Sequence, residues 1–207
     1  MLCDRKMGGI KMAKIGLDNF RYSKLTEGTD GTPSYAGAKK PAKAIDCKVT
    51  IENNSAELYA DDGLAESDYT FKKGTVALTI DEDDDTTLAE LLGHTIGEAS
   101  GQNAGELTRK DTDVAPFVGF GRILTKLVNG VYKYKVEFLP KVKFSEPSQE
   151  DSTKGESVEF KTSTLEGTVM KLADGTWSKA KTFTSKSEAV TYLENLMKAP
   201  TTQEEGS

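Results

Sequence analysis

One segment constrains the fold more than any other: LVNGVYKYKVEF, residues 127–138, in which apolar and charged residues alternate strictly. The apolar side chains fall on one face and the charged ones on the other: Tyr132, Tyr134, Val136 and Phe138 against Lys133, Lys135 and Glu137. Alternation with a period of two is typical of a half-buried β-strand. Asn129-Gly130 precedes it, and Asn-Gly between alternating strands is the strongest short-range hairpin signal. The sequence therefore predicts a hairpin with strands near residues 117–128 and 131–144.

Three further segments predict strands by the same alternation. In AIDCKVTIE, one face carries the apolar residues Ile45, Cys47, Val49 and Ile51. In GTVALTI, the apolar face carries Val76, Leu78 and Ile80. Residues 157–172 predict a strand pair whose alternation changes phase near residues 162–164, which indicates a bulge or a turn. Asp174-Gly175 predicts another turn, just before Trp177.

Two short helices are expected beside the strands. In TTLAELLG, Thr87 and Glu90 have the spacing of a capping box. Residues 186–198 place apolar side chains at helical spacing, and Ser185 with Glu188 forms a second capping box at their start. Many strands with few helices predict a mainly β fold, a β-sandwich or barrel with a flanking α-helix.

The chain divides by composition into five parts. Residues 26–43 are rich in Gly, Pro, Ser and Thr, which indicates a long loop, and Met12 has the character of a natural start. The expected parts are a leader extension of residues 1–11, an N-terminal arm or loop of residues 12–44, a β domain of residues 45–185, a C-terminal helix of residues 186–198 and a disordered tail of residues 199–207.

The bulk properties exclude several classes of protein. The formal net charge of −6 argues against avid nucleic-acid binding, which uses clustered Lys and Arg to release counterions. No apolar run approaches the roughly 20 residues that span a bilayer, and the first residues lack the apolar core of a signal peptide. The two cysteines, Cys3 and Cys47, form no disulfide framework, so we expect folding in a reducing cytoplasm.

No group of residues in the sequence predicts an enzyme, a cofactor site or a metal site. The acidic run at residues 81–85 lacks the Gly and Glu that an EF-hand requires at its sixth and twelfth positions, and a solvated turn explains it better. His94 is the only histidine and has no partnered nucleophile. Ser100 in GEASG departs from the G-x-S-x-G elbow. Gly119 and Gly121 lack the third glycine of a dinucleotide fingerprint, and they indicate a close backbone approach within a strand.

Several segments, taken in order, resemble the major tail proteins, or tail tube proteins, of long-tailed bacteriophages. They are LYADDGLAE (58–66), KKGTVALTIDEDDDTTLAELLGH (72–94), VGFGRILTKLVNGVYKYKVEFLPKVKF (118–144) and TKGESVEFKTSTLEGTV (153–169). The resemblance covers roughly residues 13–185. Each motif is of limited specificity by itself, and the ordered series carries the resemblance.

The resemblance implies a β-sandwich subunit flanked by a helix, without catalytic residues or cofactors. Such subunits form hexameric rings that stack into a tube, through which DNA passes to the host without specific binding. Extended hairpins from neighbouring subunits join to close an inner β-barrel. The implied partners are further copies of the chain and the tape measure, tail terminator and distal tail proteins, with no membrane. The implied location is the tail of a virion, after synthesis in the host cytoplasm.

Two sets of residues are candidates for these contacts. Strands 70–81 and 157–170 are the preferred barrel strands, with residues 118–144 as the alternative. The candidate lumen-facing residues are Thr75, Ala77, Thr79, Glu159 and Lys161. Residues 61–90 hold ten acidic and two basic groups, whereas residues 122–143 hold six basic and one acidic. Two patches of opposite charge on one chain favour self-association. The candidate inter-subunit residues are Asp81, Asp83, Asp84, Asp85, Lys133, Lys135, Lys141 and Lys143.

Two other classes of function stay open at this point. An Ig-like carbohydrate-binding or adhesive module also explains many strands and the single Trp177. It explains less well the unpaired Cys47 and the segregation of charge. A hydrolase ranks third, because only paired carboxylates such as Asp61 and Asp62 offer it any chemistry.

Overall fold

The computed structural model describes residues 13–41, 44–60, 63–80, 85–98, 100, 104–147 and 163–198. The described part of the chain forms ten strands and two helices, so it is mainly β as the alternation predicts. In chain order the elements are β1 Ala13–Glu27, β2 Pro33–Tyr35, β3 Ala44–Ala60, β4 Gly63–Ile80, α1 Asp85–Leu92, β5 Thr95–Ile96, β6 Leu107–Thr108, β7 Phe117–Val128, β8 Val131–Phe144, β9 Ser163–Met170, β10 Lys179–Phe183 and α2 Lys186–Leu196.

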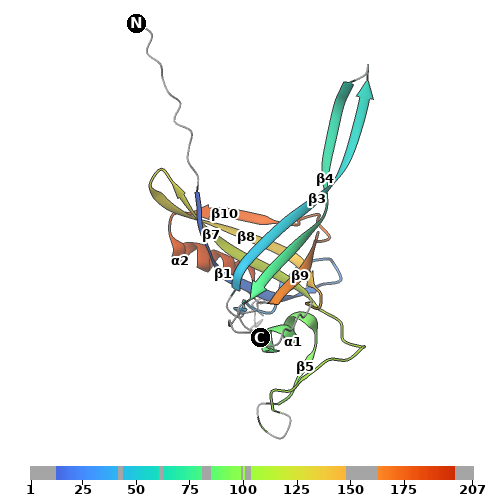
Figure 1. The fold of residues 1–207 in the computed structure, drawn as a ribbon, viewed down its shortest axis with the longest axis vertical. Coiled ribbons are helices and arrows are strands. Elements are labelled where there is room, and N and C mark those ends of the chain that lie inside the picture. The colour runs from blue at the N-terminus through green and yellow to red at the C-terminus, as the bar shows by residue number, and fades with distance from the viewer. Residues whose placement is uncertain are drawn as a thin grey trace, which may run out of the picture.

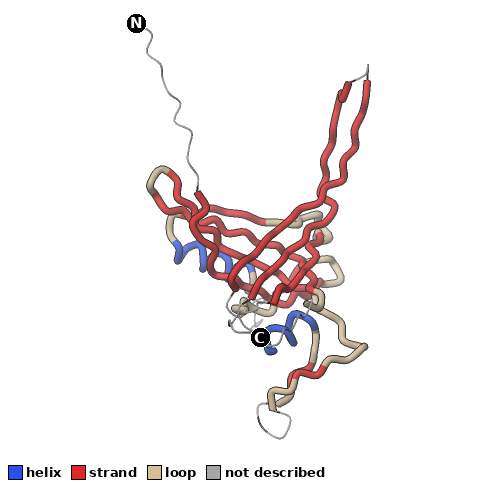
Figure 2. The backbone as a smooth tube through the Cα atoms, in the orientation of Figure 1, coloured by secondary structure: helices blue, strands red, loops and turns tan. Residues whose placement is uncertain are grey.

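Apart from the short β5–β6 ribbon, the described strands belong to one antiparallel sheet (Figure 1). Its order is β2-β1-β7-β8-β9-β4-β3. β8 shares one edge between two neighbours, because residues 134–138 pair with β10 and residues 141–144 pair with β9. The sheet curls, so that β3 and β4 cross over β1 and β7, as the backbone trace in Figure 2 also shows.

The hairpin predicted from LVNGVYKYKVEF is confirmed as β7–β8. Its two strands pair from Phe117 with Lys143 to Val128 with Val131. Asn129 and Gly130 both have positive φ, 53° and 77°. A two-residue turn with positive φ at both positions matches the twist of the flanking strands, which is why Asn-Gly is favoured there.

A bulge in β8 lets this one strand serve two cores. Val118 pairs with Val142, but Phe120 pairs with Leu139, so β8 carries one extra residue around Pro140. The extra residue reverses which side chains face which way. Val136 and Phe138 therefore pack on the side of α2, whereas Val142 and Phe144 pack on the opposite side.

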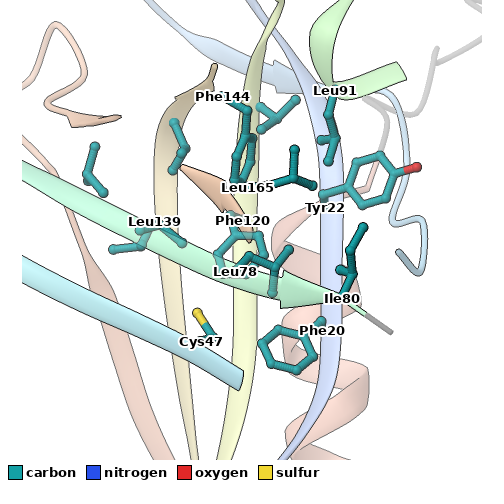
Figure 3. Packing of buried hydrophobic residues seen from close by; sticks show 14 of the residues in the cluster. Phe20, Tyr22, Cys47, Leu78, Ile80, Leu91, Phe120, Leu139, Phe144 and Leu165 are labelled. Atoms are coloured by element: carbon teal, nitrogen blue, oxygen red, sulfur yellow. The ribbon is translucent and has the colours of Figure 1, made fainter. Parts of the chain in front are cut away.

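The larger core lies inside the curl of the sheet (Figure 3). It joins residues from strands far apart in the sequence: Phe20, Cys47, Leu78, Ile80, Phe120, Phe144 and Leu165. Leu88, Leu91 and Leu92 of α1 close one end of it. Figure 3 shows Cys47 pointing into this core, which confirms the expected apolar position of that side chain. Burial raises the pKa of the Cys47 thiol, so the reactive thiolate is disfavoured.

The smaller core lies between the other face of the sheet and α2. Gly119 and Gly121 of β7 face it, and both confirm the predicted close approach. A Cβ at Gly121 would lie 2.3 Å from Leu193 Cδ1, and one at Gly119 would lie 2.6 Å from Tyr35 Cε1. The missing side chains leave the space that α2 and Tyr35 occupy.

The predicted N-terminal arm or loop of residues 12–44 was wrong for much of that range. Residues 13–27 form β1, the partner of β7 in the main sheet. A register shift between Asp18 and Arg21, with Asn19 at a φ of 53°, interrupts the alternation of β1. The interruption hides the strand from a search for period two, although Phe20 and Tyr22 are buried.

Ile45 was assigned to an apolar face but is 54% exposed. A register shift between Ala44 and Asp46 explains the difference. Ile45 is the unpaired residue at this shift, so its side chain does not share the apolar face of Cys47 and Val49.

Both helices were predicted correctly, but their capping boxes were not. α1 begins at Asp85, so Thr87 lies inside the helix, and Glu90 accepts hydrogen bonds from Tyr22 Oη (2.9 Å) and Lys39 Nζ (2.5 Å). Ser185 is the N-cap of α2 without a side-chain cap bond, since its Oγ lies 2.8 Å from Ser187 Oγ. In both helices, a side chain expected to cap the helix binds another side chain instead of the backbone at the helix start.

Candidate assembly interface

The longest element pair in the described residues is the β3–β4 hairpin. It pairs from Ala44 with Ile80 to Ala60 with Gly63, with three register shifts along its length. β9 covers β4 only over Gly74–Ile80. Beyond that point the hairpin continues as two strands alone and projects from the body of the molecule (Figure 1).

This hairpin presents open backbone edges. Among the described strands, β3 pairs only with β4, and residues 63–73 of β4 pair only with β3. Unpaired strand edges are templates for pairing with another chain, and natural monomers cover or shorten them. A two-stranded ribbon is also marginally stable alone in water. The geometry therefore favours strand addition from a second molecule.

The candidate lumen-facing residues of β4 lie on the face opposite the core. Thr75, Ala77 and Thr79 alternate with the fully buried Val76, Leu78 and Ile80. The register places three polar rows across β3, β4 and β9: Thr50-Thr75-Thr168, Lys48-Ala77-Glu166 and Asp46-Thr79-Thr164. Threonines dominate these three rows, in which Lys48 is the single basic group. The same face continues with Lys73 on β4, which pairs with Glu52, and with Lys143 on β8. Glu159 and Lys161 lie outside the described residues.

The candidate inter-subunit lysines are partly engaged within the chain. Lys135 Nζ donates to Glu137 (2.6 Å) and Lys141 Nζ donates to Glu27 (2.5 Å). Lys143 Nζ lies 5.4 Å from the centroid of the Phe117 ring. Lys133 is directly opposite another lysine, Lys126. Of the candidate aspartates, Asp85 is the first residue of α1, and Asp81, Asp83 and Asp84 lie outside the described residues.

A charged network that sequence reasoning missed lies within the curl of the sheet. Arg122 donates to Glu137 through Nη2 (2.8 Å) and Nε (3.1 Å), and its Nη1 donates to the carbonyl of Cys47 (2.7 Å). Burial alone would raise the pKa of Glu137, but hydrogen bonds from Lys135 and Arg122 outweigh it and hold that pKa below its usual value. Arg122 and Glu137 face each other across β7 and β8, which is the only sequence signal for the pair.

The variant Glu137→Gln should lose about 1–2 kcal/mol of unfolding free energy at pH 7, because Arg122 and Lys135 lose their anion in a partly buried site. A carboxylate with a lowered folded-state pKa stabilises the fold above its ordinary pKa of 4.5 and loses that effect as pH falls through the folded value. Urea unfolding of wild type and variant should therefore converge as the pH falls below 4.5. Glu52→Gln is the matched control, since its pair with Lys73 is exposed on both sides and contributes little. A pH-independent gap between wild type and Glu137→Gln would contradict the assignment.

His94, the only histidine of the sequence, has a side chain only 5% exposed. Its Nδ1 lies 2.9 Å from Asp113 Oδ2 and its Nε2 lies 2.5 Å from Glu146 Oε1. The pKa of Asp113 is lowered, chiefly by its hydrogen bond with His94. Carboxylates on both ring nitrogens tie the segment after α1 to the segment after β8, which is a structural role.

Trp177 stacks on Phe71, with ring centroids 4.6 Å apart and an angle of 4° between the planes. One face of the indole is thereby covered by the chain's own β4. The contact gives Trp177 a packing role at the side of the β3–β4 hairpin.

The comparisons with known proteins add no family assignment. A scan against protein-family models found no match to this chain, and a search of curated proteins found none either. Within the described residues, neither helix is long and apolar enough to cross a membrane. In the same part of the chain, His, Cys, Asp and Glu side chains form no group of three or more able to hold a metal ion.

Proposed function

We propose that this chain is the structural subunit of a bacteriophage tail tube, which assembles into stacked hexameric rings around a channel for DNA. The observation that carries the proposal is the β3–β4 hairpin, with its projecting length and its two open edges. The fold class and the ordered resemblance to tail tube proteins support it. The tape measure, tail terminator and distal tail proteins are the proposed further partners, and the virion tail is the proposed location.

The two edges of the hairpin are different, and this favours a ring. One edge belongs to β3 and the other to residues 63–73 of β4. If β3 of one copy pairs with β4 of the next, every contact uses two unlike surfaces. Head-to-tail contacts of this kind form a closed ring when the rotation from each copy to the next brings the last copy back to the first. The shared hairpins then form a continuous barrel without free edges.

The face opposite the core suits the wall of such a channel. Its three rows of residues across β3, β4 and β9 are mostly threonines, with Lys48 as the single basic group. Tight binding to DNA depends on many Lys and Arg contacts with phosphates. Lys73 and Lys143 continue this face, and Lys73 is paired with Glu52. A wall with few unpaired basic groups would let DNA pass without being held.

Negative-stain electron microscopy of the purified full-length chain tests the proposal. Rings or tubes of uniform diameter are the expected result, and their mass by light scattering gives the number of subunits. A sample that stays strictly monomeric at high concentration, on standing and after seeding, would contradict the proposal. Glycan-array binding by a monomeric sample would favour the adhesive module instead.

A further inference from the structure

Tyr69 is the most exposed aromatic side chain among the described residues, at 61%. It lies on the projecting part of the β3–β4 hairpin, where β4 pairs only with β3 (Figure 1). β4 carries one extra residue at Lys72, which has no partner in β3. This bulge puts Tyr69 on the same face of the hairpin as Phe71, Val76 and Leu78, which is the face of the larger core. The core face of the hairpin therefore continues beyond the body of the molecule and carries an exposed aromatic ring there.

A cavity of about 280 Å³ lies between β3 and β10. Its apolar walls include Val49 and Ile51 of β3, Leu139 of β8 and Trp177, which precedes β10. Val49 and Ile51 belong to the same face of the hairpin as Tyr69, because β3 has no register shift between Asp46 and Glu52. The volume is just below the roughly 300–1,000 Å³ of pockets for drug-sized ligands. The cavity therefore suits one large side chain.

The charged network of Arg122, Lys135 and Glu137 also lines this cavity. The bonds to Glu137 and to the carbonyl of Cys47 use only some of the N–H groups that a guanidinium and an ammonium carry. Arg122 and Lys135 therefore keep N–H groups that can donate to a further acceptor. A tyrosine side chain combines an apolar ring with a hydroxyl that accepts hydrogen bonds. Apolar walls beside free donors fit such a side chain.

Two conditions restrict how β3 of a second copy can pair with the open edge of β4. First, β9 occupies that edge over Gly74–Ile80, so the incoming strand can pair only with residues between Gly74 and the tip. An incoming β3 that pairs with this whole stretch without meeting β9 has its first residues opposite the β4 residues next to Gly74. Second, the core faces of the two strands must lie on one side of the joined sheet. Together the conditions place Tyr69 opposite Cys47 or Val49 of the second copy. Directly opposite and diagonal neighbours on one face are both within reach of an aromatic side chain, so either register brings Tyr69 to the wall formed by Val49.

We infer that Tyr69 of one copy enters the cavity between β3 and β10 of the next copy and fixes the register of the joined strands. The occupant is a second copy of this chain, because pairing core face to core face carries Tyr69 to the cavity. The ring then packs against Val49 and Ile51, and its hydroxyl accepts a hydrogen bond from Lys135 or Arg122. Strands that are polar on both faces specify their register weakly, so a single buried anchor has a large effect. This inference rests on the proposed pairing of β3 with β4, and it names the side chain that sets that pairing.

Tyr69→Ala and Thr70→Ala form a matched pair of variants. The two residues are exposed neighbours on the same edge of β4, but their side chains point to opposite faces. Both variants should unfold at the wild-type temperature in dilute, monomeric samples, because neither position is buried. The protein concentration at which half of the chains are in rings should rise at least about tenfold for Tyr69→Ala, since buried aromatic anchors dominate interface energies. Thr70→Ala should change it by less than roughly twofold. Sedimentation velocity over a dilution series measures both.

Cysteine cross-linking tests where the side chain goes. In a Cys3→Ser background the remaining cysteine, Cys47, is buried. Chains with Tyr69→Cys are mixed with chains that carry Ala180→Cys at the wall of the cavity, and the mixture is oxidised. Non-reducing electrophoresis should show a covalent dimer in the mixture well above the amount from either variant alone, because a disulfide forms only between closely placed residues.

The outcomes separate this inference from the proposed function. If wild type forms rings and Tyr69→Ala assembles as readily as Thr70→Ala, the inference is overturned while the proposed function stands. The same holds if the mixture gives no more covalent dimer than the single variants. A wild-type chain that forms no rings contradicts the proposed function itself.

Discussion

Shortening the β3–β4 hairpin should abolish ring formation and leave the domain folded. The variant replaces residues 55–69 with Asn-Gly, so that the paired residues Asn54 and Thr70 flank a two-residue turn. None of the described core residues lies in the removed segment, since the buried hydrophobic residues of β3 and β4 are Cys47, Val76, Leu78 and Ile80. The loss should therefore be confined to assembly.

The measurement is the particle mass by light scattering, together with thermal unfolding of the same sample. The control keeps the hairpin at full length and changes only the two residues between Ala60 and Gly63, with Asp61→Asn and Asp62→Gly. The control should form rings like wild type, and the shortened variant should be monomeric with a similar unfolding temperature. Rings of unchanged size from the shortened variant would show that subunits join elsewhere.

Phe120→Ala should lower the free energy of unfolding by about 3–5 kcal/mol. Phe120 is 1% exposed and lies between two other rings, with centroids 6.0 Å from Phe20 and 6.1 Å from Phe144. These neighbours come from β1 and β8, so collapse of the cavity would require two strands to move together. A loss of this size is comparable with the whole stability of many domains.

Chemical denaturation of the chain in its monomeric form measures this loss without the contribution of assembly, and the shortened-hairpin variant supplies that background. Ile45→Ala is the control, because it removes an exposed apolar side chain and should change stability by less than about 0.5 kcal/mol. Equal effects of the two substitutions would mean that the larger core does not hold β1, β7 and β8 together.

Local signals predicted much of the fold. The β7–β8 hairpin followed from alternation and Asn-Gly, and the structure has both strands where the pattern placed them. Alternation also predicted the apolar faces of β3 and β4 correctly at Cys47 and Val76, where one side of each strand is buried. The same method missed β1, because a bulge interrupts its alternation.

The candidate assembly surface was only partly predictable. The sequence-based strands at residues 44–52 and 74–80 end where apolar alternation ends, since only there does the body of the protein bury one face. The hairpin continues far beyond, and its open edges become visible only when the pairing of every strand is known. The Arg122–Glu137 pair follows from the register of the β7–β8 hairpin, but its bond to the carbonyl of Cys47 on β3 joins residues distant in sequence that no spacing rule connects.

The sequence by itself determined the class of the fold, the β7–β8 turn, the two helices and the segregation of charge, because each depends on neighbours a few residues apart. The tertiary structure decided the length of the β3–β4 hairpin and the bulge in β8, which makes the two halves of that strand face different cores. These depend on the register between strands brought together from across the chain, and one residue of register exchanges the two faces of a strand.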